Sequence, residues 1–282
     1  MYREQQRMSV VKPVVPVVTG PDPASRTGVL RLLVIPFAIY VVWMILTSLF
    51  EGNARLFLSQ DFLGIIVYTV VACIITGMII PVYCLRESFV TGAVNLFQIG
   101  FRESRRTLSA TALTSFACYL IVVLVLPSGT DRSAFAFNFL LLLPTAIASV
   151  MVCWVLLGTH VQAFVRSGGT VISIAAGSLV TAWLFCITSF AHSPPASLQP
   201  ALVGFLVLGL VAAVFFFAVR DVYAASILVA SGLALVMAGR VGISGMEAAL
   251  PAVAGSAILA VLTLFGIHLY FARNFRTVRV PA

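Results

Sequence analysis

Residues 134–158 read AFAFNFLLLLPTAIASVMVCWVLLG, and this stretch contains no Asp, Glu, Lys, Arg or His. A helix needs about 20 predominantly apolar residues to cross a hydrocarbon core roughly 30 Å thick. Further apolar runs follow and precede it, mostly separated by short segments rich in Gly, Pro, Ser or charge, as turns require. The pattern predicts an all-α membrane helix bundle with about eight transmembrane helices, at residues 32–50, 62–84, 108–127, 134–158, 170–191, 200–219, 222–239 and 248–272.

The composition indicates the same class of protein. Apolar residues make up 61% of the 282-residue chain and charged residues 9%, whereas a soluble domain carries about 25% charged and 45–50% apolar residues. The net charge of +8 would suggest a nucleic-acid partner in a soluble protein. Here the charges lie between apolar runs, so we expect no nucleic acid, and contacts with the lipid bilayer and its anionic lipids instead.

The distribution of basic residues predicts the orientation in the cell (cytoplasmic) membrane. Cytoplasmic segments carry an excess of Lys and Arg, and an N-in/C-in arrangement of eight spans puts 14 of the 17 basic residues on the cytoplasmic side. The expected cytoplasmic set is Arg3, Arg7, Lys12, Arg26, Arg31, Arg86, Arg102, Arg105, Arg106, Arg166, Arg220, Arg273, Arg276 and Arg279, and the outer set is Arg55, Arg132 and Arg240.

The chain divides into a cytoplasmic tail at 1–27, a bundle at 28–272 and a cytoplasmic tail at 273–282. We expect the first tail to be disordered, because its prolines remove helical donors. The least certain boundary lies at Arg220-Asp221. Residues 200–239 would form a helix about 60 Å long, too long for one span, so this charged pair predicts a tight hairpin between two spans.

Residues 85–106 are too polar to cross a membrane, and about 86–101 within them is the candidate for a further helix. Phe89, Ala93 and Phe97 recur at helical spacing, so the segment predicts an amphipathic helix at the cytoplasmic interface. A basic cluster, Arg102, Arg105 and Arg106, follows it. Residues 86–106 could be a simple connector or the docking site of a partner subunit.

Candidate catalytic residues come from one short motif. Gly242-Ile-Ser-Gly245 resembles the Gly-x-Ser-Gly motif of rhomboid intramembrane proteases, in which Ser is the nucleophile and a His on another helix is the base. His268 follows Ser244 on the same predicted helix, about 36 Å away, beyond hydrogen-bond reach. His192 is the histidine expected on the same outer side, so Ser244 and His192 form the candidate pair. The alternative is that Ser244 caps the last helix.

Metal and cofactor signals are weak. His160 and His268 fall near the cytoplasmic ends of their helices and could join in one metal or haem site, but neither has a second ligand at helical spacing. The five cysteines show no C-x-x-C spacing. We therefore expect no cofactor, and single histidines are commonly polar anchors.

Transport is the function class that these features favour. The acidic residues map to span ends or loops, which argues against a carrier that is coupled to ions through a midplane carboxylate. Small loops and a possible docking segment favour a transporter, a permease or the membrane subunit of a larger assembly over an enzyme. Arg220 and Asp221 could act as a gate or partner contact, or only separate two helices. The alternatives are a membrane-embedded hydrolase acting at the outer face and a structural subunit without a site.

Overall fold

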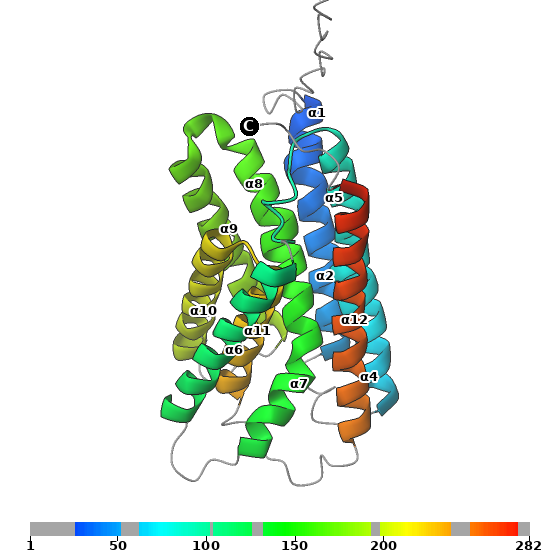
Figure 1. Cartoon of the computed structure of the whole chain (residues 1–282), viewed down its shortest axis with the longest axis vertical. Helices are drawn as coiled ribbons and strands as arrows, with labels where there is room; N and C mark the ends of the chain where they lie inside the picture. Colours follow the sequence, from blue (N-terminus) through cyan, green and yellow to red (C-terminus); the bar gives the residue numbers. More distant parts are fainter. Residues whose placement is uncertain are drawn as a thin grey trace, which may run out of the picture.

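The computed structural model describes residues 26–51, 62–101, 104–125, 132–192, 198–237 and 249–275. Within these ranges the chain forms helices and turns without any strand, so the predicted all-α bundle is confirmed. Figure 1 shows α1 (Arg26–Val29) and the end of α12 (Leu250–Phe275) at the same end of the bundle, which we call the α1 end. Most of the two expected tails, residues 1–25 and 276–282, lies outside the described residues.

Apolar helices occupy the described part of each of the eight expected ranges. Within the described residues, seven are long and apolar enough to cross a membrane, and α11 is a shorter apolar helix. In chain order they are α1–η1–α2 (Arg26–Val29, Leu30–Val34, Ile35–Glu51), α4–η2–α5 (Phe62–Tyr68, Thr69–Ile79, Ile80–Val90), α6 (Ser104–Val125), α7–η3–α8 (Arg132–Ser149, Val150–Gly158, Thr159–Phe164), α9 (Thr170–His192), α10 (Leu198–Val219), α11 (Val222–Met237) and α12. The short turn η4 (Arg166–Gly168) joins α8 to α9.

The α7–η3–α8 helix forms the centre of the bundle. Every side chain from residue 150 to residue 156 has 0% of its surface exposed, and the helix contacts η2, α9, α11 and α12. By contrast, α6 lies on the outside, with Leu113 71% and Leu124 82% exposed. Apolar side chains turned outward in this way suit a hydrocarbon solvent, in which helices satisfy their own backbone groups. The chain is a multi-pass α-helical membrane protein.

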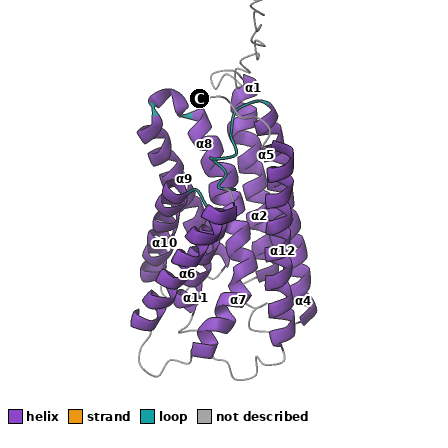
Figure 2. Ribbon diagram, viewed as in Figure 1, coloured by secondary structure: helices purple, strands orange, loops and turns teal. Residues whose placement is uncertain are grey.

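The predicted interfacial helix at 86–101 is wrong over most of its length. Helix α5 continues from the second span and ends at Val90, and residues 91–101 form turns. In Figure 2 these turns leave the end of α5 and run down into the bundle towards the start of α6. Only the first turn of the predicted helix, within α5, is helical.

The predicted hairpin at Arg220-Asp221 is confirmed. Helix α10 ends at Val219 and α11 begins at Val222, which leaves two non-helical residues between them. Arg220 has a φ of 54°, in the left-handed region that reverses the chain. The hairpin is therefore made without the Gly or Pro that normally marks such a break.

Close packing of α9 against α10 depends on Gly209. A Cβ added at this position would lie 2.9 Å from the Ala182 carbonyl oxygen, whereas one added at Gly204 would meet nothing within 4 Å. Small residues allow membrane helices to approach in this way.

We predict that Gly209→Ala will destabilise the bundle, because the α9 backbone must move away. Overpacking of this kind costs about 1–3 kcal/mol, so the melting temperature in detergent should fall by several degrees. Gly204→Ala, on the same helix, is the control and should leave it unchanged or slightly higher. Equal melting temperatures for the two variants would show that the α9–α10 contact is not tight.

Candidate functional site

The turns at 91–101 are held by their own polar side chains. Gly92, with a φ of 72°, ends α5 in the left-handed conformation that favours glycine. Asn95 and Gln98 then close a loop on each other, because each backbone N–H donates to the other side chain at 2.9 Å. Asn and Gln here serve turn chemistry, which competes with helix formation.

The apolar residues of these turns face into the bundle. Val94, Ile99 and Phe101 are 3%, 0% and 3% exposed, whereas Phe97 is 60% exposed. Phe101 stacks on Phe271 of α12 with ring centroids 5.5 Å apart. Residues 91–101, which we call the α5–α6 connection, are therefore anchored in the core near both of their ends. Between these anchors, Phe97 points outward.

The Arg220 guanidinium fastens this connection to two other elements. It donates to the Gln98 carbonyl oxygen and to Gln162 Oε1 of α8, each at 3.0 Å. The guanidinium carbon also lies 4.9 Å from the centroid of the Phe217 ring, within cation–π range. Arg220 is only 7% exposed, so these contacts replace the water that a charged group would otherwise need. We call Arg220, Asp221, Gln98, Gly100 and Gln162 the Arg220 cluster.

Gly100 is the residue of the connection that lies against the backbone of Arg220, and this close approach requires a glycine. Its φ is 82°, and an added Cβ would lie 3.2 Å from the Arg220 carbonyl carbon and 3.0 Å from Phe216. The Val222 N–H donates to the Gly100 carbonyl at 3.3 Å. The two backbones therefore meet directly, and two left-handed residues, Gly100 and Arg220, face each other across the contact.

Asp221 begins α11. Its side chain is fully buried, and Oδ1 accepts a hydrogen bond from the Ala224 N–H at 2.9 Å. A carboxylate at this N-cap position satisfies an otherwise unpaired helical donor and interacts favourably with the helix dipole. The charged pair is thus not a solvated turn but a buried structural element.

The basic cluster expected after the connection is partly described. Arg105 and Arg106 are exposed in the first turns of α6. Arg102 lies outside the described residues.

A second polar contact joins α5 to α8 through Ser88 and His160. His160 Nδ1 lies 2.7 Å from the Leu156 carbonyl oxygen, and Nε2 lies 2.6 Å from Ser88 Oγ. A carbonyl can only accept, so Nδ1 carries a proton, and in the neutral ring Nε2 accepts from the Ser88 hydroxyl. This is the relation between nucleophile and base that hydrolases use.

The surroundings of Ser88 do not complete a hydrolase site. Acyl transfer needs N–H groups that point at the developing oxyanion. The N–H groups of Thr91, Gly92, Ala93 and Val94 all donate to carbonyls of residues 87–89. The Ser88–His160 contact is therefore an interhelical hydrogen bond in the described structure.

The other sequence candidates are not brought together. His268 is 6% exposed and lies beside Tyr223, whose hydroxyl is 3.2 Å from Nδ1, and beside the Phe101 ring at 5.4 Å. The described residues contain no group of three or more His, Cys, Asp or Glu placed to hold a metal. His192 ends α9, but its side chain lies outside the described residues, as does Ser244. The Ser244–His192 pair thus stays a prediction.

A pocket of about 250 Å³ opens at the α1 end, next to Ser88. Its lining consists of Arg31, Leu32, Ile35, Cys84, Glu87, Ser88, Thr91 and Ala93. The first two spans and the start of the connection thus meet around it.

Comparisons with protein-family models, with curated proteins and with solved structures found no match to this chain.

Sequence reasoning identified Arg220 and Asp221 but missed their partners. Gln162 and Ser88 lie among other polar residues near the ends of apolar helices, and nothing in their spacing connects them to residues far away in the chain. Gly92 and Gly100 were the available signal, since both glycines lie inside the segment that was expected to be one helix.

We predict that Ser88→Ala will lower the melting temperature in detergent, because it leaves His160 Nε2 buried without its partner. Such a loss costs about 1–3 kcal/mol. Ser109→Ala is the matched control, since Ser109 is exposed and bonds only within its own helix. We also expect no labelling of Ser88 by a fluorophosphonate. Labelling that disappears in His160→Gln would instead identify a catalytic pair.

Proposed function

We propose that this chain is the membrane subunit of a transport assembly and that a soluble cytoplasmic subunit docks on residues 91–101. The observation that supports this most directly is the fastening of the connection by Arg220 to both α8 and the α10–α11 hairpin. A force on the connection would reach the central helix through two hydrogen bonds. This is the geometry that a membrane subunit needs in order to respond to a partner outside the bilayer.

The packing of the centre supports a subunit over a self-contained carrier. Residues 150–156 of the central helix are fully buried by their neighbours, so among the described residues no water-accessible path touches this stretch. Opening such a path requires the helices to move apart, and a partner could supply the energy for that step. The absence of acids from the midplane in the sequence agrees with an external energy source.

Two neighbouring helices contain the kind of segment that can rearrange. The π-helical stretches η2 and η3 contact each other inside the bundle. π-Helical turns are rare and frequently occur at functional sites. Conversion of such a stretch to α-helix would rotate the residues beyond it, and this is one way to couple the α1 end to the interior.

The outward surface of the connection suits a soluble partner. Val90 is 65% exposed and Phe97 is 60% exposed, and the exposed Arg86, Arg105 and Arg106 lie before and after them in the chain. An aromatic anchor flanked by positive charges fits an apolar pocket with an acidic rim. A P-loop ATPase subunit with such a groove is the expected partner.

Photocrosslinking in the native membrane tests this proposal. Phe97→benzoylphenylalanine should give one discrete protein adduct, identified by mass spectrometry as a nucleotide-hydrolysing subunit. Leu124→benzoylphenylalanine, at the other end of α6 and 82% exposed, should give lipid adducts.

The adduct at position 97 should weaken when Arg105 and Arg106 are both replaced by Glu, since this reverses the complementary charge. If position 97 gives only lipid adducts, as position 124 does, the connection is not a docking site and the proposal fails.

A further inference from the structure

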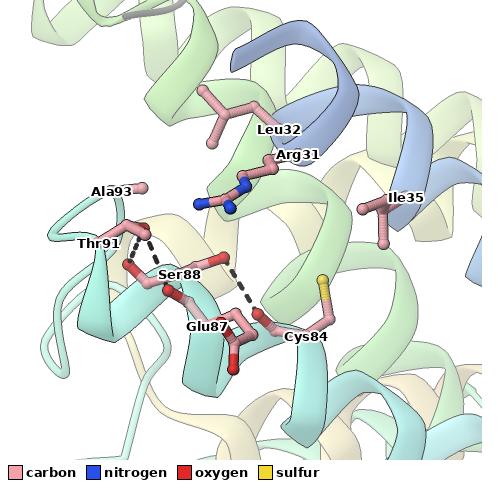
Figure 3. A pocket seen from close by; sticks show the side chains of 8 residues that line it. All are labelled: Arg31, Leu32, Ile35, Cys84, Glu87, Ser88, Thr91 and Ala93. Atoms are coloured by element: carbon pink, nitrogen blue, oxygen red, sulfur yellow. Dashed lines mark hydrogen bonds between the residues drawn. The ribbon is translucent and has the colours of Figure 1, made fainter. Parts of the chain in front are cut away.

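The pocket beside Ser88 has the size and position of a site for a lipid headgroup. Its volume of about 250 Å³ lies below the 300–1,000 Å³ that is typical of sites for drug-sized ligands. Figure 3 shows it between the start of the first span and the end of α5. It therefore lies at the level where the hydrocarbon core of a membrane would meet water.

The lining has an apolar side and a polar side. Leu32 and Ile35 supply apolar surface from the first span, and the neighbouring Val34 and Tyr83 are 49% and 64% exposed on the outside of the bundle. Arg31, Glu87 and Thr91 supply the polar surface. A ligand with a polar head and an acyl chain can satisfy both sides, with its chain lying against the exposed apolar residues.

The two charged side chains lie apart. In Figure 3 the Arg31 guanidinium reaches over the Ser88 side of the pocket, while the Glu87 carboxylate lies on the far side, and no hydrogen bond joins them. A pocket with separated charges of opposite sign is complementary to a ligand that carries both an anion and a cation. A guanidinium is well suited to bind a phosphate.

The Glu87 carboxylate decides which cation fits. A carboxylate accepts hydrogen bonds from a group with N–H donors, such as a primary ammonium, whereas a quaternary ammonium has no such donor. The Thr91 hydroxyl donates its proton to the Glu87 and Ser88 carbonyls, and the Ser88 hydroxyl shares its own between His160 and the Cys84 carbonyl. Both protons are therefore already used, which leaves Arg31 as the donor for the phosphate.

We propose that this pocket binds a zwitterionic phospholipid with a primary ammonium headgroup, such as phosphatidylethanolamine. The phosphate lies on Arg31, and the ammonium lies on Glu87 at the far side of the pocket. This site is separate from the proposed partner surface at Phe97 and does not depend on it.

Native mass spectrometry of the delipidated, detergent-solubilised chain tests the proposal without any partner. The protein is titrated with phosphatidylethanolamine, phosphatidylcholine and phosphatidylglycerol that have identical acyl chains. We expect phosphatidylethanolamine to bind about tenfold more tightly than the other two, since one hydrogen bond to a charged group is worth about that factor. Equal binding of the three lipids by the unmodified chain would overturn the proposal, whatever the variants do.

Two variants test which charged side chain binds which part of the headgroup. Arg31→Gln should weaken phosphatidylethanolamine binding by about tenfold, and Glu87→Gln should abolish the preference over phosphatidylcholine. Arg166→Gln is the control, because Arg166 is an exposed arginine in η4 at the same end of the bundle but outside the pocket lining. A preference that persists in Glu87→Gln would contradict the placement of the ammonium.

A competition arm separates a lipid from a soluble ligand of the same chemistry. Free glycerophosphoethanolamine, at a concentration equal to that of the lipid, should not displace it, because the acyl chains contribute to binding. Displacement at that concentration would overturn the lipid assignment and would indicate that the pocket binds a soluble zwitterion.

Discussion

The guanidinium of Arg220 needs partners because a buried charge without them is strongly unfavourable. It is 7% exposed, and the partners lie on different parts of the chain: the Gln98 carbonyl, the Gln162 side chain and the Phe217 ring. Satisfying one charge therefore fixes the α5–α6 connection, the central helix and the α10–α11 hairpin relative to one another. The left-handed backbone of Arg220, which costs about 1–3 kcal/mol, is tolerated because these contacts hold it.

Polar contacts join several elements in the part of the bundle towards the α1 end. They are the Arg220 cluster, the Asp221 cap and the Ser88–His160 bond, and the first two lie inside the bundle, where the connection runs down from α5 (Figure 2). Elsewhere along the spans, the helices are held by apolar packing, by small residues such as Gly209 and by single hydroxyl contacts such as Tyr68–Thr145. The surface that the polar contacts towards the α1 end support carries Phe97 and several exposed arginines, and the pocket at Arg31 and Glu87 opens beside it. Both proposals thus rely on the same rigid support but use different surfaces.

The span positions could be predicted from the sequence because apolar length alone decides them in a membrane. The break at Arg220-Asp221 was also predictable, since one helix of 40 residues would exceed the bilayer. The 86–101 segment was not, because Asn95 and Gln98 look like the polar face of a helix but bond to each other across a turn. The partners of Arg220 and His160 could not be found, since single polar residues in apolar helices carry no information about which distant helix they meet.

Hydrogen–deuterium exchange on Arg220→Gln tests most directly whether this arginine fastens the connection. The shorter, neutral side chain loses the contacts to Gln98 and Gln162, so backbone amides of 91–101 and the Val222 amide should exchange at least about tenfold faster than in the unmodified chain. Amides in the middle of α9 and α12 should keep their protection, which shows that the bundle is intact. Unchanged protection of 91–101, with the rest of the bundle also unchanged, would contradict the role given to Arg220.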